Sequence, residues 1–151
     1  MDIGTKKGYP SEALSNFAPH PFIIDGVQCN SMEGFLQSLK FQSLDMQKYV
    51  CTLIGIKAKN KGRKKNWHET QTLYWRGIAY KRDSDEYQAL LDRAYNELAK
   101  NKSFRRALLA TQNATLTHSI GKNKITETVL TEREFVHRLM KLRDKMQRGL
   151  I

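Results

Sequence analysis

Apolar residues recur three and four positions apart along much of this chain. That spacing is typical of helices with one buried face, because about 3.6 residues make a helical turn. The pattern predicts helices over residues 31–41, 45–59 and 85–99, through residues 104–109, and from Thr131 into the basic C-terminal segment. In the last helix the expected buried side chains are Phe135, Leu139, Leu142 and Met146, and the rest of its surface is expected to be basic.

Polar residues ahead of these stretches indicate where the helices begin. Asn30 stands three residues before Glu33, and Thr131 stands three before Glu134. This is the spacing of a capping box, in which two side chains satisfy backbone N–H groups of the first turn. Asp45 and Ser84 are the predicted N-caps of the next two helices, and Asn101 either ends the third helix or caps the fourth.

Two short turns predict β-hairpins. Asp25-Gly26 lies between apolar residues within 22–28, and Arg76-Gly77 lies between residues 73–75 and 78–80. A type I′ turn needs positive φ at both central residues, which favours glycine and aspartate. Residues 116–118 form a further candidate strand. The predicted fold is therefore mainly α, of the α+β class, with packed helices and a few short strands in a single domain over residues 1–151.

Composition narrows the class of protein. The chain has 151 residues, of which 40% are hydrophobic, enough for one globular core. No apolar run approaches the ~20 residues of a membrane-spanning helix, and residues 1–8 lack the apolar region of a signal peptide. Cys29 and Cys51 are too few for a disulfide framework, and Cys51 is expected in the core. A cytoplasmic location without membrane association is the expectation.

The formal net charge of +11 favours anionic partners such as nucleic acid or phosphorylated nucleotides. Residues 57–65 concentrate six basic side chains, and Gly62 is expected to end the preceding helix there. Such a run is commonly a solvated surface that maintains solubility. It is also suited to binding phosphate beside Trp67, whose indole ring is able to stack on a base. Both interpretations stay open.

The helix over residues 31–41 also carries a polar stripe. Glu33, Gln37 and Lys40 stand at positions i, i+4 and i+7 and so share one face. Gly34 beside the glutamate costs roughly 1 kcal/mol relative to alanine in a helix, unless another part of the backbone must approach closely there. The alternative is that Glu33 only caps the helix and Lys40 only faces solvent.

The block SNFAPHPFIIDG at residues 15–26, followed by Ser31, Glu33 and residues 37–41, resembles the NADAR superfamily, whose YbiA-like members are N-glycosidases. Shorter blocks extend the resemblance through Gly62-Arg63, Trp67 and residues 102–111 to Arg143, so it covers most of the chain. The chain departs from the family at Gly34, where many members have histidine. It departs again at residues 117–122, where many have an aspartate and a Trp-Gly pair.

The resemblance implies hydrolysis of a ribose–base N-glycosidic bond without a metal or organic cofactor. Glu33 would be the catalytic carboxylate, and His118 would be the acid that protonates the leaving group. Lys40, Arg63 and Lys102 would hold phosphate, Asn16 would donate a hydrogen bond to the ribose or base, and Trp67 would stack on a base. Phe17, Ser119 and Gly121 complete the expected substrate-binding set.

Three functions follow from these expectations. The high positive charge favours removal of ADP-ribose from modified guanine, in nucleic acid or in a nucleotide, with DNA or RNA as partner. A second possibility is cleavage of phosphorylated intermediates of riboflavin synthesis. A third is a non-catalytic module that binds ADP-ribose or nucleic acid. The motifs of serine hydrolases, P-loop nucleotidases, dinucleotide-binding domains and zinc peptidases do not occur.

Overall fold

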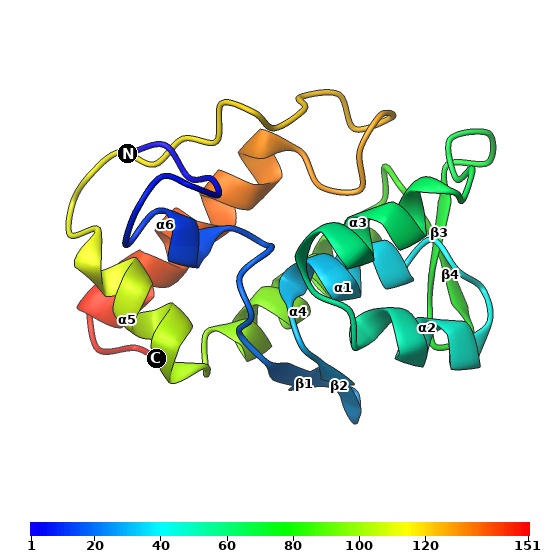
Figure 1. The fold of residues 1–151 in the computed structure, drawn as a ribbon, viewed down its shortest axis with the longest axis horizontal. Coiled ribbons are helices and arrows are strands. Elements are labelled where there is room, and N and C mark those ends of the chain that lie inside the picture. Colours follow the sequence, from blue (N-terminus) through cyan, green and yellow to red (C-terminus); the bar gives the residue numbers. More distant parts are fainter.

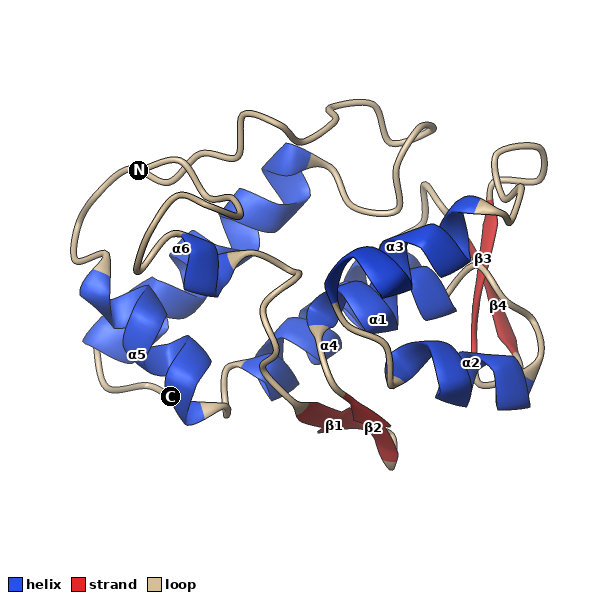
Figure 2. Ribbon diagram, viewed as in Figure 1, coloured by secondary structure: helices blue, strands red, loops and turns tan.

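A computed structural model describes all of residues 1–151 and shows an α+β domain, as the sequence predicts (Figure 1, Figure 2). The helices are α1 (Met32–Ser38), α2 (Leu44–Cys51), α3 (Gly55–Arg63), α4 (Asp85–Leu98), α5 (Lys102–Ala110) and α6 (Glu132–Gln147). The strands are β1 (Phe22–Ile24), β2 (Val27–Cys29), β3 (Thr72–Trp75) and β4 (Ile78–Lys81), and a 3-10 turn spans Glu12–Leu14.

The elements form two groups joined by α4. Helices α1, α2 and α3 pack together beside the β3–β4 hairpin, whereas α5 and α6 pack together near the N-terminal arm, residues 1–11 (Figure 1). Helix α4 contacts β1 and β4 as well as α6, so it connects the two groups. The loop between α5 and α6 crosses the top of the view in Figure 1 and faces the first group.

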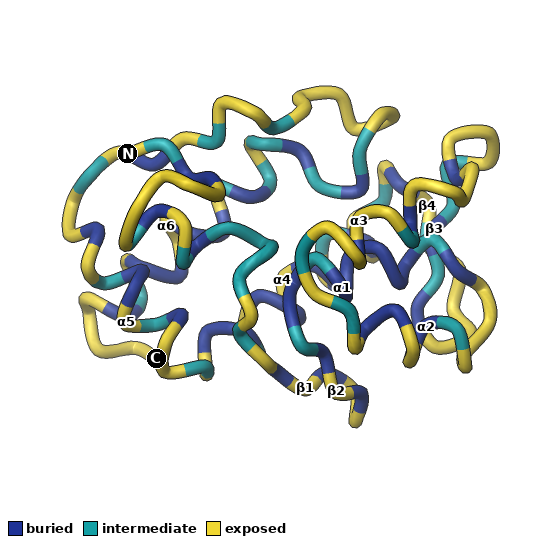
Figure 3. The backbone as a smooth tube through the Cα atoms, in the orientation of Figure 1, coloured by how far each residue is buried: buried dark blue, intermediate teal, exposed yellow.

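The apolar stripe of α1 is buried, as predicted. Phe35 and Leu39 have no exposed surface, and Met32 and Leu36 are each 2% exposed. The ring of Phe35 packs edge-on against that of Trp75, with 5.0 Å between centroids. These side chains belong to one apolar core that reaches α4 and α6. Figure 3 shows the buried positions of the chain in dark blue. Because its apolar side is fully packed, α1 is held with its polar stripe on the opposite side.

Both hairpins form as predicted, each as an antiparallel pair. Their turns have positive φ at both central residues, with values of 49° and 76° at Asp25-Gly26 and 50° and 84° at Arg76-Gly77. Ser84 and Asn101 cap α4 and α5 through their side chains, and Thr131 with Glu134 forms the complete capping box of α6. Local sequence was sufficient here because each motif involves residues only a few positions apart.

Two predicted caps are wrong. Ser31, not Asn30, caps α1 by accepting a hydrogen bond from the Gly34 N–H, and Ser43, not Asp45, caps α2. The Asn30 side chain instead donates to the Thr52 carbonyl, 3.0 Å away. The backbone of residues 51–53 lies beside Asn30 and gives its amide group a long-range partner. Glu33 is therefore not engaged in a capping box with Asn30.

The predicted helix over residues 45–59 is in fact two helices, because the chain turns between Cys51 and Gly55. Gly55 adopts a φ of 60°, which breaks the helical path. Gly62 does not end the helix, since α3 continues through it to Arg63. The predicted strand at 116–118 is reduced to a single parallel bridge between Asp2 and Thr117.

Two regions are packed in a way that the local sequence pattern does not indicate. Arg138 and Arg143 of α6 are each 6% exposed, and the Arg143 guanidinium donates to the Thr111 hydroxyl and the Ala114 carbonyl. In the N-terminal arm Ile3 is fully buried, and the Asp2 carboxylate accepts several hydrogen bonds. These partners lie far away in the sequence, so the local pattern does not reveal them.

Candidate functional site

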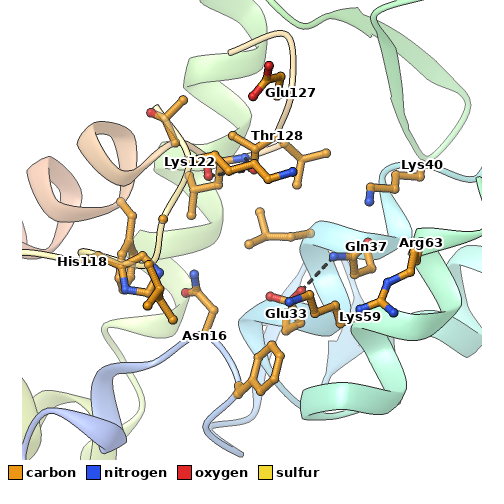
Figure 4. A pocket seen from close by; sticks show the side chains of 18 of the residues that line it. Asn16, Glu33, Gln37, Lys40, Lys59, Arg63, His118, Lys122, Glu127 and Thr128 are labelled. Atoms are coloured by element: carbon orange, nitrogen blue, oxygen red, sulfur yellow. Dashed lines mark hydrogen bonds between the residues drawn. The ribbon is translucent and has the colours of Figure 1, made fainter. Parts of the chain in front are cut away.

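A cavity of about 490 Å³ lies where the two groups of helices face each other (Figure 4). One wall consists of α1 and α3, and the other consists of residues 118–131 and the start of α6. Its volume is within the about 300–1,000 Å³ typical of small-molecule sites. Of the site residues predicted from sequence, it is lined by Asn16, Phe17, Glu33, Lys40, Arg63, Trp67, His118 and Gly121.

Glu33 is the acidic residue of the α1 wall, and its partly exposed side chain lies in the cavity (Figure 4). Its Oε1 accepts a hydrogen bond of 2.8 Å from the Gln37 side-chain amide. Burial raises the pKa of Glu33 above its ordinary value, because desolvation outweighs the hydrogen bond and the nearby positive charges, which favour the ionised form. The carboxylate is therefore a stronger base than an exposed glutamate.

Close packing of α3 on α1 holds Gln37 in place. The Gln37 side chain is 7% exposed and lies directly over Gly62, where a Cβ atom would come within 1.8 Å of Oε1. No other residue type leaves this space open, so the glycine of the predicted Gly-Arg block provides room for Gln37 and does not end the helix. The Gln37 Oε1 has no hydrogen-bond partner in the protein. The side chain is thus positioned by packing on Gly62 and by its bond to Glu33.

Replacing Gly62 with alanine should displace Gln37 from Glu33. We expect the pKa of Glu33 to rise further, because the ionised carboxylate loses a donor, and the free energy of unfolding to fall by about 1–3 kcal/mol from overpacking. Carboxyl-carbon NMR titration and urea unfolding measure the two effects. Asn60→Ala, at an exposed position of the same helix, is the control, and an unchanged Glu33 pKa in Gly62→Ala would contradict the assigned role of Gln37.

Gly34 permits a second close approach, as the sequence suggested. A Cβ atom there would lie 2.6 Å from the Leu53 carbonyl oxygen and 3.0 Å from that of Val50. Both contacts are with backbone, which cannot move aside as a side-chain end can. The histidine common at this position in the NADAR superfamily therefore does not fit this packing, and the connection between α2 and α3 occupies its space.

Five positively charged side chains surround the cavity: Lys40, Lys59, Arg63, Lys65 and Lys122. None of them is within ion-pair distance of a carboxylate. The pKa of Lys40 is lowered by burial and by the neighbouring cations, although Glu33 partly opposes the shift. Unpaired cations that repel one another are stabilised by an anion, so the cavity is electrostatically suited to phosphate groups.

Asn16 offers a directed donor near Glu33 (Figure 4). Its Oδ1 accepts a 2.7 Å hydrogen bond from the hydroxyl of Tyr95, a buried residue of α4. With the amide oxygen bonded to Tyr95, the Nδ2 group has no partner in the protein and is free to donate into the cavity. Asn16 is positioned from behind by a side chain 79 residues away in sequence.

His118 lies on the wall opposite α1 and is held in one orientation (Figure 4). Its Nδ1 is 2.7 Å from the Ile3 carbonyl oxygen, and its ring packs edge-on against Phe135 at 5.1 Å. A carbonyl only accepts hydrogen bonds, so Nδ1 carries the proton. In the neutral ring Nε2 is then a free acceptor, and in the protonated ring it is a free donor. Gly121 packs on this ring, where a Cβ atom would approach Cδ2 to 2.7 Å.

Three of the predicted residues have different surroundings from those expected. Trp67 lines the cavity but is only 3% exposed, belongs to the apolar core and packs against the His68 ring at 4.7 Å between centroids, so little of its ring surface is available to stack on a base. Lys102 is exposed on the first turn of α5 and is not among the cavity residues. Ser119 also lies outside the lining, because its hydroxyl and N–H both donate to Asp2.

Several lining residues were missed by sequence reasoning as individual site residues. They include Lys59 and Lys65 from the basic run, and His68, Lys122, Glu127 and Thr128. Lys59 and Arg63 are four residues apart on α3, so a helical interpretation of the run would have placed them on one face. Lys122, Glu127 and Thr128 lie in a loop without periodicity, and the sequence carries no signal for them.

No group of three or more histidine, cysteine, aspartate or glutamate side chains converges in a way suited to a metal ion. None of the helices combines the length and the apolar character needed to cross a bilayer.

Comparison with known proteins places the chain in a family. Residues 8–144 match the family described as Bacteriophage protein GP30.3. A relative in Enterobacteria phage T4, described as an uncharacterized 17.1 kDa protein in the Gp30-rIII intergenic region, is 39% identical over 149 residues, which cover 97% of this chain and 98% of the relative. The NMR structure of the E. coli protein YbiA is similar in fold, with a TM-score of 0.65 at 16% identity over 99% of this chain and 86% of YbiA. The fold is thus YbiA-like, and the chain belongs to the bacteriophage GP30.3 family.

Proposed function

We propose that this protein is an N-glycosidase that hydrolyses the bond between a ribose and a base in a phosphorylated substrate, and that it removes ADP-ribose from modified guanine. The observation that carries the proposal is Glu33, a carboxylate of raised pKa in a cavity with five unpaired cations. The YbiA-like fold and the resemblance to the NADAR superfamily support the same class of reaction.

The chemistry suits one carboxylate and one histidine. Cleavage of a glycosidic bond passes through a state with positive charge on the sugar, which a carboxylate stabilises. Glu33 takes a proton from water as the water oxygen bonds to the anomeric carbon, and the bond from that carbon to the base nitrogen breaks. Protonated His118 gives its Nε2 proton to the departing base. The proton on Glu33 then returns to His118 through solvent.

The remaining side chains favour a substrate with phosphate next to ribose. Lys59 and Arg63 on α3 and Lys122 on the opposite loop face the cavity from both sides, which suits a substrate with more than one phosphate (Figure 4). The Asn16 amide is available to donate to a ribose hydroxyl or to the base. A nucleoside diphosphate joined to a second ribose supplies partners for all of these groups, whereas a neutral sugar leaves the cations unpaired.

Mass spectrometry of two separate incubations, with calorimetry of ADP-ribose binding, tests the proposal. DNA bearing ADP-ribosylated guanine should yield free ADP-ribose and unmodified guanine, whereas phosphorylated riboflavin-pathway intermediates should remain intact. Release of the base from the riboflavin intermediates alone would transfer the assignment to that substrate. ADP-ribose that binds in calorimetry while neither substrate is cleaved would overturn the enzymatic proposal and leave a binding module, an outcome that the altered Gly34 position would then explain.

A further inference from the structure

The N-terminal arm contacts the cavity wall that carries His118. The Ile3 carbonyl accepts the hydrogen bond from the His118 Nδ1 at 2.7 Å, and the Ile3 N–H donates to the Thr117 carbonyl at 2.7 Å. Ile3 itself is fully buried. The backbone of Ile3 therefore contacts both the peptide bond that precedes His118 and the ring of His118 itself.

The Asp2 side chain forms hydrogen bonds with the residues on either side of His118, Thr117 and Ser119. Its Oδ1 accepts from the Ser119 N–H at 2.8 Å and from the Thr117 hydroxyl at 3.0 Å. Its Oδ2 accepts from the Ser119 hydroxyl at 2.7 Å and from the Lys7 ammonium at 3.0 Å. Four donors, led by those of Ser119, hold the pKa of Asp2 well below its usual range, so it stays ionised at neutral pH.

Asp2 thus binds the residues immediately before and after His118, while Ile3 binds the ring of His118 itself. The ring has only two polar atoms, and Nδ1 is occupied by the Ile3 carbonyl. Nε2 has no hydrogen-bond partner within the protein, although His118 lines the cavity. Beyond these contacts with Asp2 and Ile3, the segment is held by hydrogen bonds from the Thr117 N–H to the Met1 carbonyl, from the His118 N–H to the Glu132 carboxylate and from the Glu132 N–H to the Lys122 carbonyl, and by packing on Phe135.

We propose that Asp2 is a positioning residue. By clamping residues 117–119, it keeps the Ile3 carbonyl against Nδ1 and so fixes His118 in the tautomer that presents Nε2 to the cavity. The arm is then a built part of the site, although it stands more than a hundred residues from His118 in the sequence. This also assigns Ser119 a structural partner in place of the substrate contact expected from sequence.

Nitrogen-15 NMR of the histidine rings in the free protein tests the tautomer directly. At a pH where His118 is neutral, the wild-type protein should show Nδ1 protonated and Nε2 bare. Asp2→Leu, similar in size but unable to accept a hydrogen bond, should convert this signal to a mixture of both tautomers. Asp2→Asn retains an amide oxygen for the Ser119 N–H and Thr117 hydroxyl and should preserve the wild-type signal.

Lys7→Ala is the matched control, because Lys7 touches the Asp2 carboxylate but not residues 117–119. It should leave the tautomer unchanged. If Asp2→Leu does not fold, as judged by circular dichroism, Ser119→Ala removes one of the hydrogen bonds to Asp2 and should give a partial mixture. A wild-type ring protonated on Nε2, or an unchanged tautomer in a folded Asp2→Leu or Ser119→Ala protein, would overturn the proposal.

The catalytic consequence rests on the proposed function, whereas the tautomer does not. If the glycosidase assignment holds, Asp2→Leu should lower kcat about tenfold with little change in KM, a part of the about 10²–10⁴-fold that a general acid contributes. If Asp2→Leu gives a mixture of tautomers but the wild-type protein cleaves none of the tested substrates, the positioning role of Asp2 is retained and the glycosidase assignment is rejected. The two conclusions therefore fail separately.

Discussion

Glu33→Gln should abolish most of the hydrolytic activity while leaving the fold intact. The amide cannot take a proton from water, and loss of a general base lowers turnover by about 10²–10⁴-fold. Because the pKa of Glu33 is raised, the ionised form is disfavoured in the folded protein, so the neutral amide should leave the free energy of unfolding unchanged or increase it. Activity measured by release of ADP-ribose and stability measured by urea unfolding give the two results.

Glu127→Gln is the matched control, since Glu127 also lines the cavity but is exposed, and its hydrogen bonds, to His68 and Lys124, involve only its backbone. It should retain nearly full activity. The pH–rate profile adds an independent check, because the acidic limb of the wild-type enzyme should lie above the ordinary glutamate pKa of about 4.3. Full activity in Glu33→Gln, or equal losses in both variants, would remove Glu33 from the role of base.

Arg82→Ala should destabilise the protein more than other substitutions away from the cavity. Arg82 is 1% exposed and makes two hydrogen bonds to the Glu134 carboxylate, of 2.6 and 3.1 Å, and one to the Thr128 carbonyl. Removing one partner of a buried ion pair costs about 3–5 kcal/mol, because the other charge is left without compensation. For a protein of this size the corresponding fall in Tm is about 10 °C or more, measurable by calorimetry.

The stabilisation by the Arg82–Glu134 pair should decrease at acidic pH. Burial alone would raise the pKa of Glu134, but hydrogen bonds from Arg82, the Thr131 N–H and Gln88 outweigh it and lower the pKa. The Glu134 carboxylate therefore binds a proton less readily in the folded chain than in the unfolded chain. The Arg82–Glu134 pair stabilises the fold fully at pH values above the pKa of Glu134 in the unfolded chain, and this stabilisation is lost as the pH falls through the lower pKa of the folded chain. The stability difference between wild type and Arg82→Ala should narrow accordingly in acid.

Arg93→Ala provides a matched comparison at an exposed ion pair. Arg93 lies 2.8 Å from Asp25, with side-chain exposures of 50% and 34%, and Asp25 keeps a hydrogen bond from Trp75 without it. Such pairs contribute about 0–1 kcal/mol because solvent screens them. Equal destabilisation by Arg82→Ala and Arg93→Ala would show that burial of the Arg82–Glu134 pair has no energetic consequence.

The sequence by itself determined the features that depend on neighbours a few positions apart. The two hairpin turns, the caps at Ser84 and Thr131 and the buried stripe of α1 all follow from local spacing and backbone preference. The same spacing predicted that Glu33, Gln37 and Lys40 share one helix face, and all three line the cavity, although α1 ends at Ser38 and Lys40 lies in the turn after it. The local pattern failed where a distant partner competed, as at Asn30, whose amide bonds to Thr52 instead of capping α1.

Only the tertiary structure decided what surrounds Glu33. Gln37 is held by packing against Gly62, the orientation of Asn16 is fixed by Tyr95, and the His118 ring is fixed by the backbone of Ile3. Each contact joins segments far apart in the chain, and its geometry depends on how whole helices pack. A residue pattern specifies which face of an element is polar, but the packing of the core specifies which residues lie across the cavity. The cations around Glu33 and the shift of its pKa therefore could not be derived from the sequence alone.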